Sequence, residues 1–289
     1  MKIGLLAFVT AQSVDPAALA RKCESLGFES FYLPEHAIIP VRHKTRYPLS
    51  EDGEIPEPYS QMVDPFVGLT LAAAATKTIG LGTGICLVPE RHPIVLAKEV
   101  ATLDHYSGGR FIFGIGAGWL RDESEIMGVD FKRRWPITRE YIRAMKELWT
   151  QPEASFDGQF IKFPPVKCNP KPARKPHPPV HVGAGGIGPN MDRALRDTVE
   201  IGDGWAPLGL TPEALANELE KLKKMCAEVG RDFNKLEITM YAPRTDGDPK
   251  RVRKHYGEAG AHRLVFLNDS PMPATCERQL EELARAWIG

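Results

Sequence analysis

The sequence lacks a long apolar run, an excess of charge of either sign and a cysteine framework. No apolar stretch in the 289 residues approaches the ~20 residues that a membrane-spanning helix needs, and the opening MKIGLLAFV is too short for a signal peptide. The 37 basic and 37 acidic residues cancel, so no overall field attracts nucleic acid or an anionic membrane. We therefore expect a soluble, cytoplasmic protein that binds neither, with the basic clusters at 132–134 and 251–254 as solvated faces.

The five cysteines are widely spaced and never form a C-x-x-C pair. An odd number of such thiols is typical of a reducing compartment and does not predict disulfides. His177 and His181 have the spacing of metal ligands on a helix, but Pro178 and Pro179 lie between them and exclude that helix. No cysteine has zinc-finger spacing, so no metal site is predicted.

Strand and helix signals alternate along the whole chain. Asp15-Pro16 and Asp64-Pro65 are typical helix starts, and FIFGIGAGW is too apolar for a strand with one face in water. The strands are predicted at 2–9, 28–35, 79–88, 110–118, 179–184, 203–208, 235–242 and 262–268. Eight strand–helix repeats indicate a closed parallel barrel, an α/β (β/α)8 TIM barrel with insertions. We expect residues 1–289 to form this one domain.

In such a barrel the chemistry occurs at the C-terminal ends of the strands. Residues 37–63 follow the second strand and residues 119–135 follow the fourth, so both insertions should lie at that end. Segment 156–179 has a predicted hairpin turn at Asp157-Gly158 but follows a helix, which places it at the opposite end. We expect it to have no catalytic role.

Some residues at strand ends are candidates for a binding site. His36 ends the second strand, and Arg91 and His92 follow the third. Arg91 and His92 have an alternative role in bracing the loop and starting the next helix. The glycines within 80–84 and 114–118 leave room for a flat ligand, and their spacing differs from the G-x-G-x-x-G of a Rossmann loop.

The segment VGAGGIGPN at 182–190 leads from a strand through glycines into a helix. Backbone N–H groups at a helix N-terminus bind anions, and glycine lets a phosphate approach them. The segment is therefore a candidate phosphate site, with an ordinary strand-to-helix turn as the alternative.

Several segments are similar to one known family. They are SFYLPEH at 30–36, RHPIVLAKEVATLDHYSGGR at 91–110, GIGAGW at 114–119, PPVHVGAGG at 178–186 and GDGW at 202–205. Together they resemble the luciferase-like monooxygenase superfamily, in particular its branch of oxidoreductases that depend on the deazaflavin coenzyme F420. The resemblance implies a bacterial luciferase-like barrel that pairs into a homodimer.

The resemblance also implies roles for individual residues. His36 would contact the coenzyme ring as a proton donor or as a stabiliser of the reduced ring, a role that suits a group titrating near neutral pH. The peptide bond between Gly84 and Ile85 would be cis and would support the ring from behind. The expected cofactor contacts are Gly84, Ile85, Gly116, Gly118, Trp119, Gly183, Ala184, Gly185 and Gly186. The candidate substrate contacts, in contrast, are inferred from loops at strand ends: Arg91 and His92 after the third strand and Glu123 after the fourth.

Three functions follow from the sequence as hypotheses. We favour a coenzyme F420-dependent oxidoreductase that transfers hydride between the deazaflavin and an organic substrate, aromatic or extended and apolar. The alternatives are an FMN-dependent monooxygenase supplied by a separate flavin reductase, and a non-catalytic flavin-binding protein. We expect F420 to bind more tightly than FMN, because its oligoglutamate tail can reach the basic residues Arg42, Lys44 and Lys132.

Overall fold

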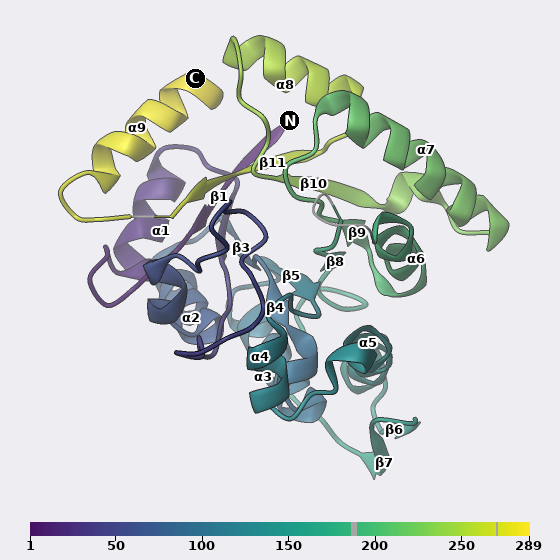
Figure 1. The fold of residues 1–289 in the computed structure, drawn as a ribbon. Helices are drawn as coiled ribbons and strands as arrows, with labels where there is room; N and C mark the ends of the chain where they lie inside the picture. Colours follow the sequence, from purple (N-terminus) through teal and green to yellow (C-terminus); the bar gives the residue numbers. More distant parts are fainter. Residues whose placement is uncertain (186–189, 270) are drawn as a thin grey trace.

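The chain folds into a closed barrel of parallel strands surrounded by helices (Figure 1). The structure is a computed structural model and describes residues 1–185, 190–269 and 271–289. The barrel strands are β1 (Lys2–Ala7), β2 (Ser30–Leu33), β3 (Gly80–Thr83), β4 (Cys86–Leu87), β5 (Phe111–Gly116), β8 (Val180–Val182), β9 (Gly204–Trp205), β10 (Glu237–Tyr241) and β11 (Arg263–Asn268). Pairing of β1 with β11 and of β3 with β5 closes the sheet, which confirms the predicted (β/α)8 barrel.

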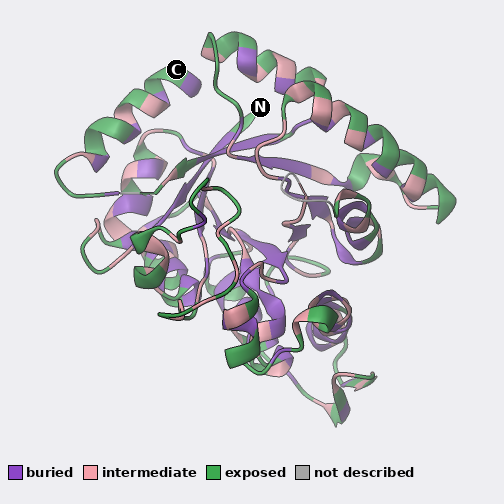
Figure 2. Cartoon of the chain, viewed as in Figure 1, coloured by how far each residue is buried: buried purple, intermediate pink, exposed green. Residues whose placement is uncertain are grey.

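The helices follow the strands in the predicted alternation. They are α1 (Pro16–Ser25), α2 (Pro65–Ala75), α3 (Pro93–Tyr106), α4 (Arg121–Ile126), α5 (Arg134–Thr150), α6 (Met191–Ile201), α7 (Pro212–Glu228), α8 (Pro249–Glu258) and α9 (Cys276–Trp287). Short 3-10 turns are η1 (Glu57–Gln61), η2 (Val88–Glu90), η3 (Phe131–Arg133) and η4 (Phe233–Lys235). Asp15 and Asp64 cap α1 and α2 by accepting backbone N–H groups, as predicted. Figure 2 shows the strands buried and the outer faces of the helices exposed.

The third barrel strand is not continuous over 79–88, as the sequence pattern predicts, but is divided into β3 and β4. The peptide bond between Gly84 and Ile85 lies at the interruption and is cis, which confirms that prediction. The Gly84 amide donates to the Leu33 carbonyl of the neighbouring strand (2.8 Å). β4 then resumes pairing with β5, with Cys86 beside Ile115.

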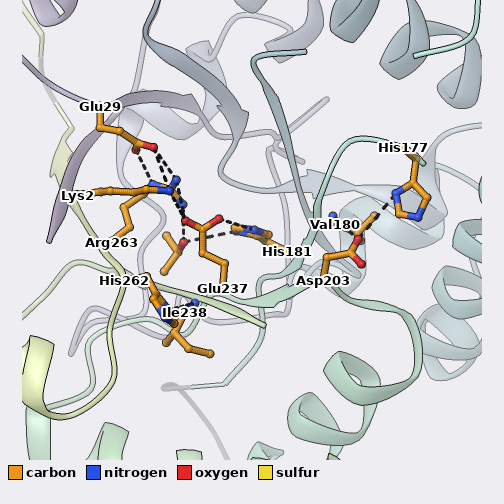
Figure 3. A network of polar contacts seen from close by, with 11 residues as sticks. Lys2, Glu29, His177, Val180, His181, Asp203, Glu237, Ile238, His262 and Arg263 are labelled. Carbon is orange, nitrogen blue, oxygen red and sulfur yellow. Dashed lines mark hydrogen bonds and ion pairs between the residues drawn. The ribbon is translucent and has the colours of Figure 1, made fainter. Parts of the chain in front are cut away.

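A network of charged side chains fills the N-terminal end of the barrel (Figure 3). The Arg263 guanidinium is 1% exposed. It donates to both carboxylate oxygens of Glu29 (2.7 and 2.8 Å) and to the Thr239 hydroxyl (3.0 Å), and lies 3.1 Å from Glu237. Lys2 also donates to Glu237 (2.8 Å). Burial alone would raise the pKa of Glu237, but Arg263 and Lys2 lower it to about 2. The network therefore joins β1, β10, β11 and the start of β2.

The segment after α5 forms the antiparallel hairpin of β6 (Ala154–Asp157) and β7 (Lys162–Val166), with the predicted turn. Its tip extends back along α5, because Glu140 accepts the backbone N–H groups of residues 159–161. Arg133, which precedes α5 at the catalytic end, lies 4.4 Å above the Phe160 ring. The prediction that this segment stays at the opposite end is therefore wrong for the tip of the hairpin.

None of the helices in the described ranges combines the length and hydrophobicity of a membrane-spanning helix. All five cysteines fall in the described ranges and are buried as thiols.

Replacing Arg263 with methionine tests the network. Arg263→Met would leave Glu29 and Glu237 without their main partner in a partly buried site, so we expect the free energy of unfolding to fall by about 3 kcal/mol. The matched control is Arg278→Met, because the Arg278 side chain is 75% exposed and its loss should change stability by less than about 0.5 kcal/mol. Urea denaturation at neutral pH measures both, and equal losses would contradict the assignment.

Candidate functional site

A cavity of about 530 Å³ opens at the C-terminal ends of the strands. This volume is typical of sites for small molecules and cofactors. The predicted cofactor contacts that line it are His36, Gly84, Ile85, Gly116, Gly118, Trp119, Gly183, Ala184 and Gly185. Gly186 lies outside the described residues. The fold thus brings these nine residues, from four chain segments, to one cavity.

His36 lies between a carboxylate and an indole in the cavity wall. Its Nδ1 is 2.5 Å from Glu123 Oε2, and the side chains are 6% and 1% exposed. The Trp119 Nε1–H donates to His36 Nε2 (3.3 Å). Because Nε2 accepts this bond, the proton of a neutral imidazole belongs on Nδ1, where it is donated to Glu123.

The candidate substrate contacts Arg91, His92 and Glu123 are not among the residues that line the cavity. Glu123 is buried behind His36 and also accepts the backbone N–H groups of residues 37 and 38 (2.9 and 3.3 Å). Arg91 is held by carboxylates, with Glu35 at 2.6 Å and Asp64 at 2.5 Å. His92 is exposed and occupies the N-cap position of α3. For Arg91 and His92 the geometry therefore agrees with the alternative of loop bracing and helix start.

The glycines of the strands do not leave empty room for a ligand, because side chains of the protein occupy the space. A Cβ on Gly82 would lie 2.2 Å from the Tyr32 ring. A Cβ on Gly116 or Gly183 would lie 2.4 or 2.3 Å from the side chain of Ile85. The glycines thus allow Ile85 to pack between two strands and to present its outer surface to the cavity.

Two arginines in the cavity wall were not identified by the sequence pattern. Arg134 donates to the carbonyls of Gly118 (3.0 Å) and Phe131 (2.7 Å) and lies 3.7 Å above the Phe131 ring. Burial, together with the charges of Arg193 and Arg121, lowers the pKa of Arg134 to about 10. The interpretation of 132–134 as a solvated face is therefore wrong for Arg134.

Arg193 belongs to the first turn of α6, next to the predicted phosphate segment. Its Nε is buried and has no hydrogen-bond partner among the described residues. Asp197 is the nearby carboxylate, and it bonds Arg139 at 2.7 Å. A positively charged wall with an unused donor is suited to an anionic ligand. A basic residue one turn into the helix after a glycine-rich strand end is the sequence signal that could have indicated it.

The insertion at 37–63 supplies an aromatic and proline-rich wall, so its predicted place at the catalytic end is confirmed. The Tyr47 and Tyr59 hydroxyls are 2.7 Å apart, and their rings contact Trp119 and His36, with centroids 5.5 and 5.4 Å apart. Asp122 anchors the loop by accepting the Thr45 hydroxyl and the backbone N–H groups of residues 44 and 45, which lower the pKa of Asp122 to about 2.

The predicted tail contacts Arg42, Lys44 and Lys132 are exposed and do not line the cavity. Across the described ranges, no group of three or more His, Cys, Asp or Glu side chains is arranged to hold a metal ion.

Comparison with known proteins places these features in context. A family model described as luciferase-like monooxygenase matches residues 9–269. An uncharacterised protein of Mycobacterium tuberculosis is 43% identical over 235 residues, which are 80% of this chain and 80% of that protein. The family match therefore covers most of the residues that line the cavity and most of the barrel.

Two solved structures illustrate the range of similar folds. An F420-dependent secondary alcohol dehydrogenase in complex with an F420–acetone adduct has a TM-score of 0.75 at 18% identity, over 99% of this chain and 98% of that chain. The oxygenating constituent of 3,6-diketocamphane monooxygenase of Pseudomonas putida, in complex with FMN, has a TM-score of 0.65 at 18% identity, over 99% and 76%. At these identities the likeness shows the fold and does not choose between the two coenzymes.

Proposed function

Because the chain belongs to the luciferase-like monooxygenase family, which includes oxidoreductases and monooxygenases, we propose that it is a coenzyme F420-dependent oxidoreductase acting on an apolar organic substrate. The observation that supports this best is the placement of an imidazole and of two cationic side chains in separate parts of the cavity wall. The cavity wall holds His36, which is backed by the buried Glu123. It also holds Arg134 and Arg193, and among the described residues no carboxylate contacts Arg134.

The residues present fit a coenzyme with a planar ring and an anionic chain. Gly183, Ala184 and Gly185, with Arg134 and Arg193, would hold the phosphate, because backbone N–H groups and guanidinium donors both suit phosphate oxygens. Ile85 and His36 would border the ring. When bound, the deazaflavin supplies a carbon centre that gives or accepts a hydride and reacts little with oxygen.

The protein itself orients the substrate and moves a proton. His36 Nε2 is the imidazole atom available to a substrate hydroxyl, since Nδ1 is occupied by Glu123. A substrate hydroxyl could replace the Trp119 N–H on Nε2, because that bond is long at 3.3 Å. Tyr47, Tyr59 and Trp119 surround this position with aromatic surface and favour an aromatic or extended apolar substrate.

An FMN-dependent monooxygenase with a separate reductase is the second candidate, and similarity to the FMN-bound Pseudomonas putida structure supports it. A non-catalytic flavin-binding protein is a third, which the buried His36–Glu123 pair disfavours, since coenzyme binding alone does not require it.

The coenzyme choice can be measured by titrating the purified protein with F420 and with FMN and following fluorescence quenching. We expect F420 to bind at least tenfold more tightly, a difference of roughly 1.4 kcal/mol. The physical reason is that Arg42 and Lys44 are exposed on the loop beside the cavity, where an acidic tail can reach them. Tighter binding of FMN, with oxygen-consuming turnover when a flavin reductase is added, would select the monooxygenase.

Changing His36 to alanine should slow hydride transfer by more than tenfold and leave folding and coenzyme affinity largely intact, because a positioned acid–base group contributes about 10²–10⁴-fold. The measurement is single-turnover oxidation of reduced coenzyme. His92→Ala is the control, since His92 is exposed and outside the cavity wall. Equal rates in wild type and His36→Ala would reduce His36 to a structural residue.

We also propose that two copies pair through α2 and α3. α2 has the sequence PFVGLTLAAAA, which is apolar on every face, and such helices are usually covered on all sides. Val67 and Leu71 on α2 are 64% and 49% exposed, and Val95 on α3 is 56% exposed. A homodimer would cover them.

Light scattering after size-exclusion chromatography tests the pairing. The double change Val67→Glu and Leu71→Glu should give monomers, because it puts four charges into the paired interface, two from each copy. The control Ile126→Glu changes an equally exposed side chain on α4 and should leave the mass unchanged. A wild-type protein that is monomeric at micromolar concentration would exclude the homodimer.

A further inference from the structure

Glu90 lies at the end of η2, behind the cavity wall, and its carboxyl group is close to that of Glu123. Its Oε1 accepts a hydrogen bond from the Ser124 hydroxyl (2.7 Å), and Ser124 is the neighbour of Glu123 on α4. Its Oε2 is buried and has no hydrogen-bond partner in the described part of the chain. A Cβ built on Gly118 would lie 3.3 Å from Oε1, so the backbone of the cavity wall covers the carboxyl group.

The charged groups that face Glu90 are acids. Glu123 approaches it from α4 and Glu35 from the end of β2. The neighbouring cation Arg91 is engaged by Glu35, Asp64 and Glu99. Burial, followed by repulsion from Glu123, raises the pKa of Glu90 to about 8, although the Ser124 bond opposes this. Burial and the neighbouring acids therefore favour the protonated form of Glu90.

Glu123 is in the opposite situation. It accepts one hydrogen bond from the imidazole of His36 and two from backbone N–H groups. The Glu123 carboxyl oxygen beside Nδ1 and the Trp119 N–H beside Nε2 both favour an imidazole with N–H at Nδ1 and a lone pair at Nε2.

We propose that Glu123 and Glu90 are positioning residues that act together on His36. Glu123 fixes the tautomer with the proton on Nδ1, so that Nε2 faces the cavity as a proton acceptor. Glu90 lies beside Glu123 with a buried, unpartnered Oε2 and a bond from Ser124, so its protonation state sets how much negative charge faces the imidazole from behind. The positioning roles can be tested without the proposed function. Only the measurement of hydride transfer rests on it.

Nitrogen NMR of the histidine side chains tests the proposal without coenzyme. The His36 signals are assigned by their loss in His36→Ala. In the wild type we expect a protonated Nδ1 and an unprotonated Nε2, and both signals should move with a midpoint near pH 8 as Glu90 ionises. In Glu90→Gln the tautomer should stay and the movement near pH 8 should disappear. In Glu123→Gln the preference for the Nδ1–H tautomer should weaken, because a neutral amide replaces the carboxyl group while the Trp119 bond to Nε2 remains.

Two further variants keep the test decisive. Glu125→Gln makes the same chemical change on the exposed side of α4, where the Glu125 side chain is 56% exposed, and should match the wild type. Ser124→Ala removes the hydrogen bond that favours ionised Glu90, so the midpoint should rise above that of the wild type. An Nε2–H tautomer in the wild type, or an unchanged midpoint in Glu90→Gln, would overturn the proposal.

Hydride-transfer rates separate this proposal from the proposed function. With F420 and an active substrate, Glu123→Gln should lower kcat more than tenfold at unchanged coenzyme affinity, whereas Glu90→Gln should keep the rate at pH 7 and lose the inflection near pH 8. If no variant and no wild-type protein transfers hydride, the proposed function fails while the NMR result stands. If the wild type turns over but the tautomer is wrong, only the positioning roles fail.

Discussion

The buried guanidinium of Arg263 determines which end of the barrel is closed by packed side chains. Its ion pairs with Glu29 and Glu237 close the N-terminal end with charged side chains that satisfy one another. Above them a layer containing Tyr32 and Tyr241 fills the middle, with ring centroids 5.6 Å apart. Tyr241 also forms part of the cavity wall. Among the described residues the barrel is therefore packed at its N-terminal end, and the cavity opens at its C-terminal end.

Most of the fold was predictable because each strand–helix repeat carries its own local pattern. Helix starts such as Asp15 and strand segments such as 111–116 depend on neighbours in the sequence, so periodicity and capping residues reveal them. The division of β3 from β4 is not visible in the apolar run 79–88; the resemblance, rather than the pattern, pointed to Gly84 and Ile85. The course of the hairpin tip depends on Glu140, about twenty residues away in the sequence, and no local pattern reports it.

The site shows the same division between local and distant information. His36 and the glycines around 116 and 183 could be placed because the C-terminal ends of all the barrel strands lie at the same end of the barrel. Glu123 could not be given its role, because its bond to His36 joins residues 87 positions apart. Arg134 was misread for a related reason: a basic cluster in the sequence does not reveal which of its members turns inward. The position of a residue at a strand end follows from the fold pattern, whereas its hydrogen-bond and ion-pair partners depend on how distant segments pack.

The distribution of charge around the cavity gives a ligand a preferred orientation. Arg134 and Arg193 are close enough for their charges to lower the pKa of Arg134, so an anionic group between them relieves repulsion and gains hydrogen bonds. The carboxylates near His36 are already engaged, with Glu35 in the cavity wall held by Arg91 and Glu123 behind the wall held by His36. An acidic group placed there would face like charge in a low-dielectric site. The proposed coenzyme would therefore bind with its acidic group toward the arginines and its ring beside the lone pair of His36.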